Sequence, residues 1–298
     1  MKSIHISLVY VLSILMIGFT SCSKDDVAGS ATPSPEGGGS TNTVPTSFTQ
    51  KVLIETFTGA GQAQCPDGFV KLDGIVNATN SKAIPVNVHF SDGMEIPQYT
   101  TLSTTYAGSN PMMFPSAMIN RVPSLSNVMF NRTQWQTNYD VAKNKTAKCG
   151  LSINSILSGN TATINVKCGF NQTLTGAHTV TVYLIENNVK GSGAMYDQRN
   201  SYNATTGHPY YATGDPILNF NHQNVLRKTV SAAMGDAIAT EKLVAGGLET
   251  KTYSVNISGY KSADLYVVAF ITKSGTSATT YEILNVQRAK INTTQEWD

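Results

Sequence analysis

The chemistry that this sequence could perform centres on Cys65 and on Gln62, three positions before it. Two cysteines at this spacing, C-x-x-C, exchange a disulfide: the first attacks as a thiolate and the second resolves the mixed disulfide. Here a glutamine stands in the attacking position, and its amide can form neither a thiolate nor a mixed disulfide. The spacing therefore predicts a degenerate site in which a dithiol–disulfide cycle cannot close.

A buried strand and a helix must position this cysteine. Val52 to Phe57 form a β-branched and aromatic run typical of a strand buried on both faces, and Thr58 to Gly61 break it. Pro66, directly after Cys65, favours a helix start, and apolar residues follow at helical spacing. A second buried strand from Ala83 to Phe90 gives a β-α-β order with parallel pairing. These are the parts of a thioredoxin-like redox site with its cysteine at a helix N-terminus.

Further elements complete this half of the chain. We predict a strand from Ser116 to Asn120 and a helix from Thr133 to Lys143. His89 and Asp92 follow a strand end of the kind where ligands bind in α/β sheets, so they could form a metal-binding or acid–base pair. No third ligand stands at a suitable spacing, which favours a histidine that caps the loop. We therefore expect no metal and no cofactor.

From Lys148 the hydrophobic pattern changes to period two, and a hairpin with one polar face is predicted around Ser158-Gly159-Asn160. Further strands are expected at His178–Glu186, Asn224–Val230, Thr250–Ile257, Leu265–Thr272 and Tyr281–Ala289. Seven short strands separated by turns are typical of an immunoglobulin-like β-sandwich. The predicted fold class is thus α/β plus all-β, with a thioredoxin-like N-terminal domain at residues 49–146 and an immunoglobulin-like β-sandwich domain at residues 147–298.

The hairpin places two cysteines on one inward face. If Ser158-Gly159 is its two-residue turn, Cys149 lies directly opposite Cys168, whereas a slip of two residues makes the pair diagonal. Two alternatives remain open for this pair. The cysteines form a cross-strand disulfide, or they are buried free thiols that act as small hydrophobic side chains.

Asn187 to Phe220 is the least hydrophobic and most tyrosine-dense part of the chain. Loops of this length are usually functional or disordered, and tyrosine among Ser, Gly and Asn is the composition of binding loops. The candidate binding residues are Arg199, Tyr202, His208, Tyr210 and Tyr211. The alternative is an ordered decoration that packs on the sandwich.

The N-terminus predicts export and lipidation. Lys2 precedes an apolar stretch, Ile6 to Phe19, that is too short to span a bilayer, so residues 1–21 form a signal peptide. Phe19-Thr20-Ser21-Cys22 is a relaxed lipobox, which would make Cys22 the first mature residue, acylated with fatty acids such as palmitate. The alternative is an ordinary secretory signal cut elsewhere. Residues 22–48 are rich in Gly, Ser, Thr and Pro and should form a flexible tether.

Charge and length exclude several classes of function. The 21 Lys and Arg residues against 19 Asp and Glu give a net charge of +2 with no basic run, so we expect no nucleic-acid partner. The sequence contains no P-loop, zinc motif or set of nucleophile, base and orienting residue. Its length beyond the leader is sufficient for two ordinary domains with separate cores. With Cys22 acylated, three cysteines remain, so at most one disulfide can form within the chain.

Most of the chain after Lys51 resembles the twenty-eight-kilodalton outer-membrane protein family of Gram-negative lipoproteins. The resemblance is carried by E-x-F-T-G at Glu55 to Gly59, by Cys65-Pro66, by Phe114 to Arg121 and by His222 to Arg227. It implies a thioredoxin-like N-terminal part and a C-terminal β-sandwich, with a cis-proline at Pro115 beside the cysteine motif. It also makes Gln198, His222 and Arg227 family positions, without a chemical role. The first cysteine, often present in the family, is Gln62 in this chain.

These observations predict a lipoprotein of the outer membrane that acts as a binding or adhesion module. Ser23 to Asp26 resembles the short charged signal that directs some lipoproteins to the cell surface. The expected partners are the membrane, through the lipid anchor, and a protein, peptide or glycan ligand. The alternative is a thiol-dependent oxidoreductase or redox chaperone that uses Cys65 with a cysteine of another protein.

Overall fold

A computed structural model describes residues 43–107 and 112–298, all of which belong to one folded unit, Ser40–Asp298. The predicted signal peptide, Cys22 and most of the predicted tether lie outside the described residues. Three α-helices occur in the described part of the chain: α1 (Cys65–Asn77), α2 (Tyr99–Ala107) and α3 (Trp135–Lys143). None of these described helices has both the length and the apolar character needed to cross a membrane.

The strands of residues 43–107 and 112–298 form two sheets. The larger has nine strands, in the order β12 (Ile283–Lys290), β11 (Leu265–Lys273), β7 (His178–Glu186), β8 (Val225–Thr229), β2 (Ala83–His89), β1 (Val52–Thr58), β3 (Ser116–Ile119) and β4 (Phe130–Asn131), with β9 (Asp236–Ala237) paired to β7. The smaller has four, in the order β10 (Leu248–Asn256), β6 (Thr161–Phe170), β5 (Cys149–Ser158) and β13 (Thr294–Gln295).

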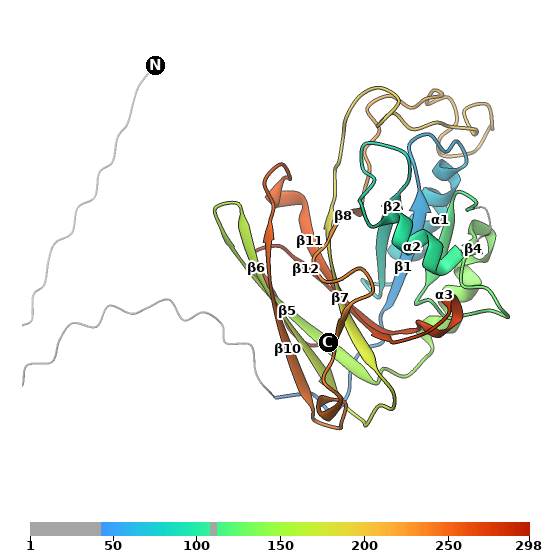
Figure 1. The fold of residues 1–298 in the computed structure, drawn as a ribbon. Helices are drawn as coiled ribbons and strands as arrows, with labels where there is room; N and C mark the ends of the chain where they lie inside the picture. The colour runs from blue at the N-terminus through green and yellow to red at the C-terminus, as the bar shows by residue number, and fades with distance from the viewer. Residues whose placement is uncertain (1–42, 108–111) are drawn as a thin grey trace, which may run out of the picture. The chain divides into compact units, whose positions relative to one another are not determined.

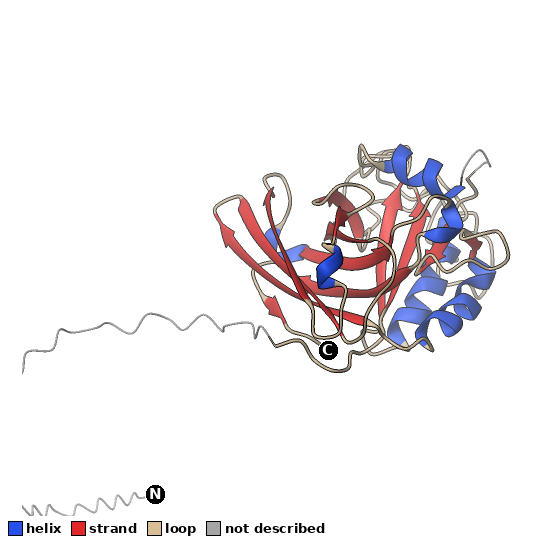
Figure 2. Ribbon diagram, turned by 60° about the horizontal axis from the view of Figure 1, so that its bottom comes forward, coloured by secondary structure: helices blue, strands red, loops and turns tan. Residues whose placement is uncertain are grey.

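Strand β1 lies inside the larger sheet. It pairs in parallel with β2 along its whole length and antiparallel with β3. All seven of its residues are buried, as predicted for a strand covered on both faces. Leu72 of α1 and Trp135 of α3 share a core with Ile54 on one face, whereas Leu102 of α2 packs with Leu53 on the other. In Figure 2 the longer helices lie at the right of the molecule, beside the strands of the larger sheet.

The two halves that the sequence separates near residue 146 share this sheet. Strand β8 pairs antiparallel with β7 and meets β2 in parallel at Asn87 and Val225. One hydrophobic core contains Phe57 from β1 together with Tyr183 from β7 and Phe270 from β11. Residues on both sides of position 146 thus share this core. The alternation of apolar residues shows which faces are buried but not which distant strands become neighbours.

A second core fills the space between the smaller sheet and strands β7, β11 and β12. It includes Val166 and Phe170 of β6, Val182 of β7 and Val267 of β11, all fully buried. The two facing layers are visible at the left of Figure 2. The period-two pattern predicted these strands to within a few residues, because one face of each contacts this core and the other is more polar.

Helix α2 and the two-residue strands β4, β9 and β13 were not predicted. Helix α2 has the sequence YTTLSTTYA, and threonine has a low intrinsic helix propensity. Its buried residues are Tyr99, Leu102 and Tyr106, which stand at helical spacing. Tertiary packing of this face thus outweighs the unfavourable propensity.

The cysteine hairpin has the second of the two registers considered, the one shifted by two residues that makes the cysteine pair diagonal. Its loop is Gly159-Asn160 rather than Ser158-Gly159, so Cys149 faces Phe170 and Cys168 faces Leu151. Gly159 has φ +55°, and glycine is the residue that accepts positive φ at the first loop position of a two-residue hairpin. Both thiols are free and fully buried, which corresponds to the second of the two alternatives for this pair.

A buried ion pair joins β1 to the residues after β3. Arg121 donates two hydrogen bonds to Glu55, from Nε and Nη2, each 2.7 Å long, and each side chain is 1% exposed. The Tyr183 hydroxyl donates to the same carboxylate, and the guanidinium lies 4.5 Å from the ring centre of Tyr106. The charges therefore neutralise one another inside the shared core.

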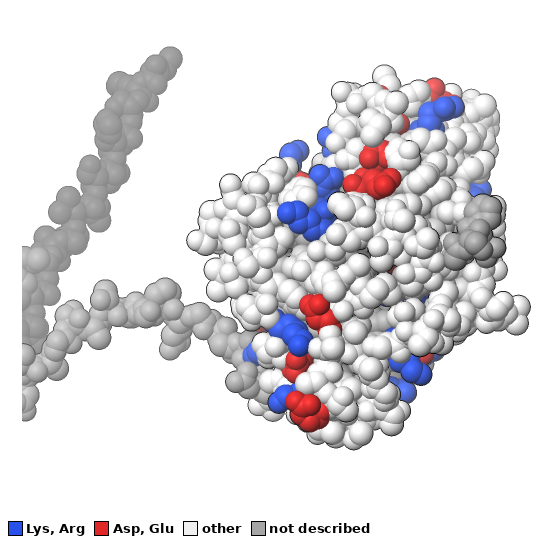
Figure 3. Space-filling model, in the orientation of Figure 1, with Lys and Arg blue, Asp and Glu red and all other residues white. Residues whose placement is uncertain are grey.

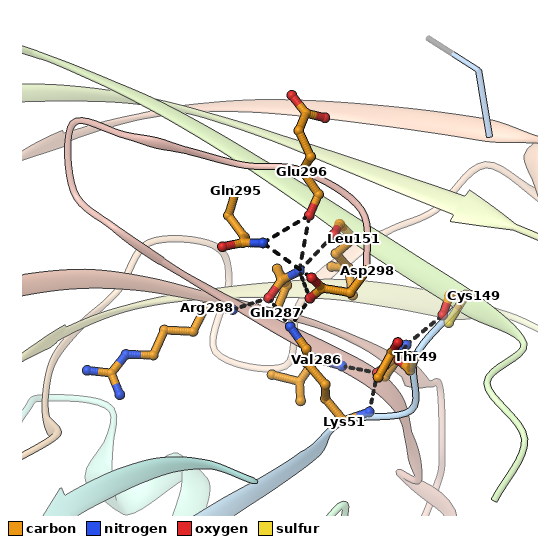
Figure 4. Close-up of polar contacts among 11 residues, drawn as sticks. Thr49, Lys51, Cys149, Leu151, Val286, Gln287, Arg288, Gln295, Glu296 and Asp298 are labelled. Carbon is orange, nitrogen blue, oxygen red and sulfur yellow. Dashed lines mark hydrogen bonds and ion pairs between the residues drawn. The ribbon is translucent and has the colours of Figure 1, made fainter. Parts of the chain in front are cut away.

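The C-terminus is tied to the start of β1 (Figure 4). Lys51 donates a 2.7 Å hydrogen bond to Gln287 of β12 and forms an ion pair with Asp298. Gln287 in turn donates to the Asp298 carboxylate, at 2.7 Å. Burial lowers the pKa of Lys51 to about 8. This cluster holds the C-terminal residue against Lys51, directly before β1, and against β12.

Candidate functional site

The predicted degenerate motif forms a turn between β1 and α1. The Gln62 N–H donates to the Gly59 carbonyl and the Cys65 N–H donates to the Gln62 carbonyl, each with a donor–acceptor distance of 3.0 Å. Cys65 is the first residue of α1 and Pro66 the second, so the proline occupies a position where a missing N–H leaves no hydrogen bond unmade. The sequence thus predicted the local geometry of this turn.

The Cys65 side chain is completely buried, at 0% exposed. Burial raises the pKa of the thiol to about 11, and the positive charge of Arg132 opposes this rise only in part. At neutral pH only about one molecule in 10⁴ would carry the thiolate, the form that attacks disulfides. A helix N-terminus can lower a thiol pKa, but here desolvation outweighs it.

Pro115 lies against the same helix. The Phe114–Pro115 peptide bond is cis, as predicted. A Cβ on Gly68 would lie 2.6 Å from Cγ of Pro115, so the glycine permits this close approach. Gly68 stands three residues after Cys65, which places the proline beside the first turns of α1.

A long segment between β7 and β8, residues 187–224, covers this turn; we call it the covering segment. It is the long loop at the top of Figure 1, next to α1 and β2. Its backbone is bonded to itself, since Gln198 pairs with Ile217 and Val189 pairs with His222. The segment is therefore an ordered cap that packs on the turn between β1 and α1, and at Asn187 it also bonds to Asp264, directly before the sandwich strand β11.

Gln198 fastens the cap to the turn. Its side chain is 0% exposed, and its amide Nε2 lies 3.2 Å from the carbonyl oxygens of both Ala60 and Gln62. Two backbone hydrogen bonds lie beside it. The Arg199 N–H donates to the Ala60 carbonyl at 2.8 Å, and the Ser201 N–H donates to the Ala63 carbonyl at 2.9 Å. Sequence reasoning noted Gln198 only as a family position, and polarity in a loop gave no signal that it would be buried.

A polar cluster surrounds the exposed edge of the turn. Arg132 donates to Asp67 at 2.5 Å, to the Gln64 side chain at 2.9 Å and to the Tyr202 hydroxyl at 2.8 Å. The Tyr202 ring stacks on His208, with 4.2 Å between ring centres. Arg132 was not among the predicted site residues, yet it joins α1 to the covering segment.

The five candidate binding residues do not form one surface. Tyr202 and His208 point toward the turn, and Tyr210 is partly buried against Phe220. Arg199 forms an ion pair with Asp215, at 2.8 Å, and stays about half exposed, while Tyr211 is 47% exposed. Only part of the predicted set is therefore free to meet another molecule.

The covering segment also docks on the loop after β2. The Gly93 N–H donates to the Met195 carbonyl at 3.1 Å, and a Cβ on Gly93 would lie 2.5 Å from the Tyr196 ring.

Arg227 of β8, the third family position, pairs with Glu186 at 3.2 Å and lies 4.9 Å from the ring centre of Tyr260. Its contacts are structural.

His89 and Asp92 form a buried pair in this loop. The Asp92 carboxylate accepts a 2.6 Å hydrogen bond from His89 Nδ1 and 2.8 Å bonds from the N–H groups of Ala60 and Met94. Burial raises the pKa of Asp92, but these hydrogen bonds outweigh it and hold the pKa below its ordinary value. The pair therefore anchors the loop to the turn after β1. Among the described residues, no three His, Cys, Asp or Glu side chains gather to hold a metal ion.

Charged side chains of both signs are mixed on the face of the molecule that Figure 3 shows. On the face drawn in Figure 3, Lys and Arg side chains lie in small groups mixed with Asp and Glu. This distribution agrees with the net charge of +2.

Comparison with known proteins gives one family and two similar structures. A family model described as outer membrane protein Omp28 matches residues 103–295. The structure of HBP35 of Porphyromonas gingivalis is similar with a TM-score of 0.63 and 18% identity, over 83% of this chain and 76% of that one. A protein of Agrobacterium tumefaciens is similar with a TM-score of 0.50 and 11% identity, over 84% of this chain and 98% of that one. No curated protein matches. At these identities the structural similarity describes the fold alone.

Proposed function

Since the chain belongs to the Omp28 family of outer membrane proteins, we propose that it is a lipid-anchored surface protein that binds a ligand and performs no thiol–disulfide turnover. The observation that carries this proposal is the closure of the turn between β1 and α1. The residue at the attacking position is Gln62, whose carbonyl accepts a hydrogen bond from the buried Gln198 side chain, and the Cys65 side chain is 0% exposed. A lone thiol can be trapped as a mixed disulfide but has no partner to resolve it.

The fold supports a thioredoxin-like interpretation of residues 49–146. The β1–α1–β2 unit has parallel strands, β3 lies antiparallel beside β1, and a cis-proline stands next to the cysteine-bearing helix. Two facing antiparallel layers support an immunoglobulin-like interpretation of residues 147–298. On this interpretation a redox scaffold has kept its shape and has received a cap over the place where a substrate disulfide would approach.

The outer face of the covering segment is the proposed binding surface. Leu218 is 66% exposed, Met195 50% and Tyr211 47%, although the backbone beneath them is held by many hydrogen bonds. Exposed apolar and aromatic side chains on a rigid loop lose little conformational entropy when they contact a partner. The thiol-dependent alternative requires access to the Cys65 sulfur, and this side chain is 0% exposed.

Binding by the covering segment can be tested on a printed array of glycans and extracellular peptides. We expect labelled full chain to bind a subset of spots, and a Tyr211→Ser, Leu218→Ser variant to lose them. Cys65→Ser should bind like the wild type, since the thiol contributes no surface. Loss of binding in Cys65→Ser with retention in the double variant would contradict the proposal.

The lipid anchor gives a second test. Cells that express the protein and grow with radioactive palmitate should label it, and Cys22→Ala should abolish the label because the thioether can form only at that sulfur. Cys168→Ser is the matched control and should be labelled normally, since that thiol is buried inside the sandwich. Label that persists in Cys22→Ala would refute lipidation at this residue.

A further inference from the structure

A small cavity lies between α1, β2 and the end of the covering segment. Its volume is about 50 Å³, enough for an ion with a water molecule. Four of its lining residues have side chains that can bind or attract a cation: Asp73 from α1, Asn87 and His89 from β2, and His222. Asn87 and His89 share one face of β2 because side chains alternate along a strand. The cavity is distinct from the buried Cys65 turn.

Three buried atoms of these residues have no hydrogen-bond partner within the described chain: Oδ1 of Asn87, Nε2 of His89 and Nδ1 of His222. The three side chains belong to residues only 1–3% exposed. Buried polar atoms are nearly always satisfied, so three unpaired atoms around one cavity call for a specific explanation.

The opposite atom of each side chain fixes what the unpaired atom can do. Nδ1 of His89 donates to the Asp92 carboxylate at a distance of 2.6 Å, and Nε2 of His222 donates to the Tyr196 carbonyl at a distance of 2.8 Å. In neutral imidazoles, Nε2 of His89 and Nδ1 of His222 therefore carry lone pairs. The Asn87 amide nitrogen donates to the Gln223 carbonyl over 2.7 Å, which leaves its oxygen as the unpaired acceptor. All three atoms are thus acceptors.

We propose that this cavity binds one divalent first-row transition-metal ion, such as Zn²⁺, through His89 Nε2, His222 Nδ1 and Asn87 Oδ1. A single water molecule can donate to only two acceptors, whereas a cation accepts all three lone pairs at once. Imidazole nitrogens suit Zn²⁺, Cu²⁺ and Ni²⁺. The ring centres of His89 and His222 lie 5.2 Å apart, a separation that lets both rings reach one ion.

The surroundings match those of metal-binding histidines. Such a histidine almost always donates its other ring N–H to a carboxylate or a backbone carbonyl, and these are the partners of His89 and His222. The Asp73 carboxylate, which also lines the cavity, supplies a negative charge near the ion. Two of the three proposed protein ligands are histidines, and the third is the amide oxygen of Asn87. The site therefore contains fewer than three His, Cys, Asp or Glu ligands.

The test uses the detergent-solubilised full chain, stripped with EDTA and titrated with ZnCl₂ by calorimetry. We expect one ion per chain for the wild type, and affinity at least tenfold weaker in His89→Gln and in His222→Gln. Asp92→Asn, which weakens the orientation of His89, should cost about 10- to 100-fold. The matched control is His178→Gln, because His178 is equally buried but lies outside the cavity and contacts the Gly176 carbonyl.

A crystal of the Zn²⁺-treated wild type gives a second measurement that needs no variant. We expect an anomalous peak at the zinc absorption edge between His89 and His222. Ordered water only in the cavity, no binding in the calorimeter, or equal affinity in wild type, His89→Gln and His222→Gln would each overturn the proposal. Zn²⁺ binding that is equal in the wild type and the cavity variants would indicate an ion on the protein surface, and it would overturn the proposal as well.

Discussion

Replacing Arg121 with methionine should lower the free energy of unfolding of the full chain by about 3–5 kcal/mol. The change leaves the Glu55 carboxylate in the core without the two 2.7 Å hydrogen bonds that now neutralise it. Its remaining side-chain contact in the shared core is the 3.4 Å bond from the Tyr183 hydroxyl, which carries no charge. An unpaired buried charge is costly because the protein interior solvates it poorly.

The measurement is urea unfolding of wild type and variant, followed by circular dichroism. Arg199→Met is the matched control: it also removes an arginine from a carboxylate, but the Arg199 side chain is 54% exposed, so the loss should be far smaller. A double variant, Glu55→Leu with Arg121→Met, should recover part of the stability, since no charge is left unpaired. Equal losses in Arg121→Met and Arg199→Met would show that the buried pair has no special weight.

Cys65 should react with a disulfide reagent at least about 100-fold more slowly in the native protein than in urea at pH 7.5. The native pKa of about 11 lies above the ordinary value of 9.0, and two pKa units reduce the thiolate about 100-fold even before burial blocks the reagent. Because the native pKa is the raised one, the native rate should keep rising with pH up to about 11, whereas the rate in urea levels off near 9. Peptide mapping by mass spectrometry separates Cys65 from the other cysteines.

Gln198→Ala should raise this native rate tenfold or more, because the amide that bonds the covering segment to Ala60 and Gln62 is lost. Gln136→Ala is the control, since Gln136 is exposed on α3 and its side chain donates to Asp140 of the same helix. Rapid reaction of the wild type, or no difference between the two variants, would indicate that the cap does not protect the thiol.

Local patterns predicted the elements that position the site. The apolar run of β1, Pro66 after Cys65 and the alternation after Lys148 each depend on neighbours in sequence, and the structure has a strand or helix at each place. Two hairpin registers, two residues apart, stayed open because the pattern of apolar faces is unchanged by an even shift, whereas the position of Gly159 in the loop decides between them.

Long-range contacts could not be predicted in the same way. The pairing of β8 with β2 joins residues Val225 and Asn87, and the sequence of neither strand indicates that the other will be its neighbour. The covering segment has the composition of a solvent-exposed loop, yet Gln198 is fully buried because it satisfies carbonyl groups of a turn more than a hundred residues earlier. Polar residues buried for hydrogen bonding look the same in sequence as polar residues in water.

Insulin reduction in the presence of dithiothreitol tests the central claim most directly, namely that the turn between β1 and α1 is a closed scaffold without redox turnover. The wild-type full chain should give only the background rate of the reductant, and Cys65→Ser should give the same rate, because Gln62 cannot attack and Cys65 is sealed. A wild-type rate well above background that falls to background in Cys65→Ser would contradict the account and establish a thiol-dependent enzyme instead.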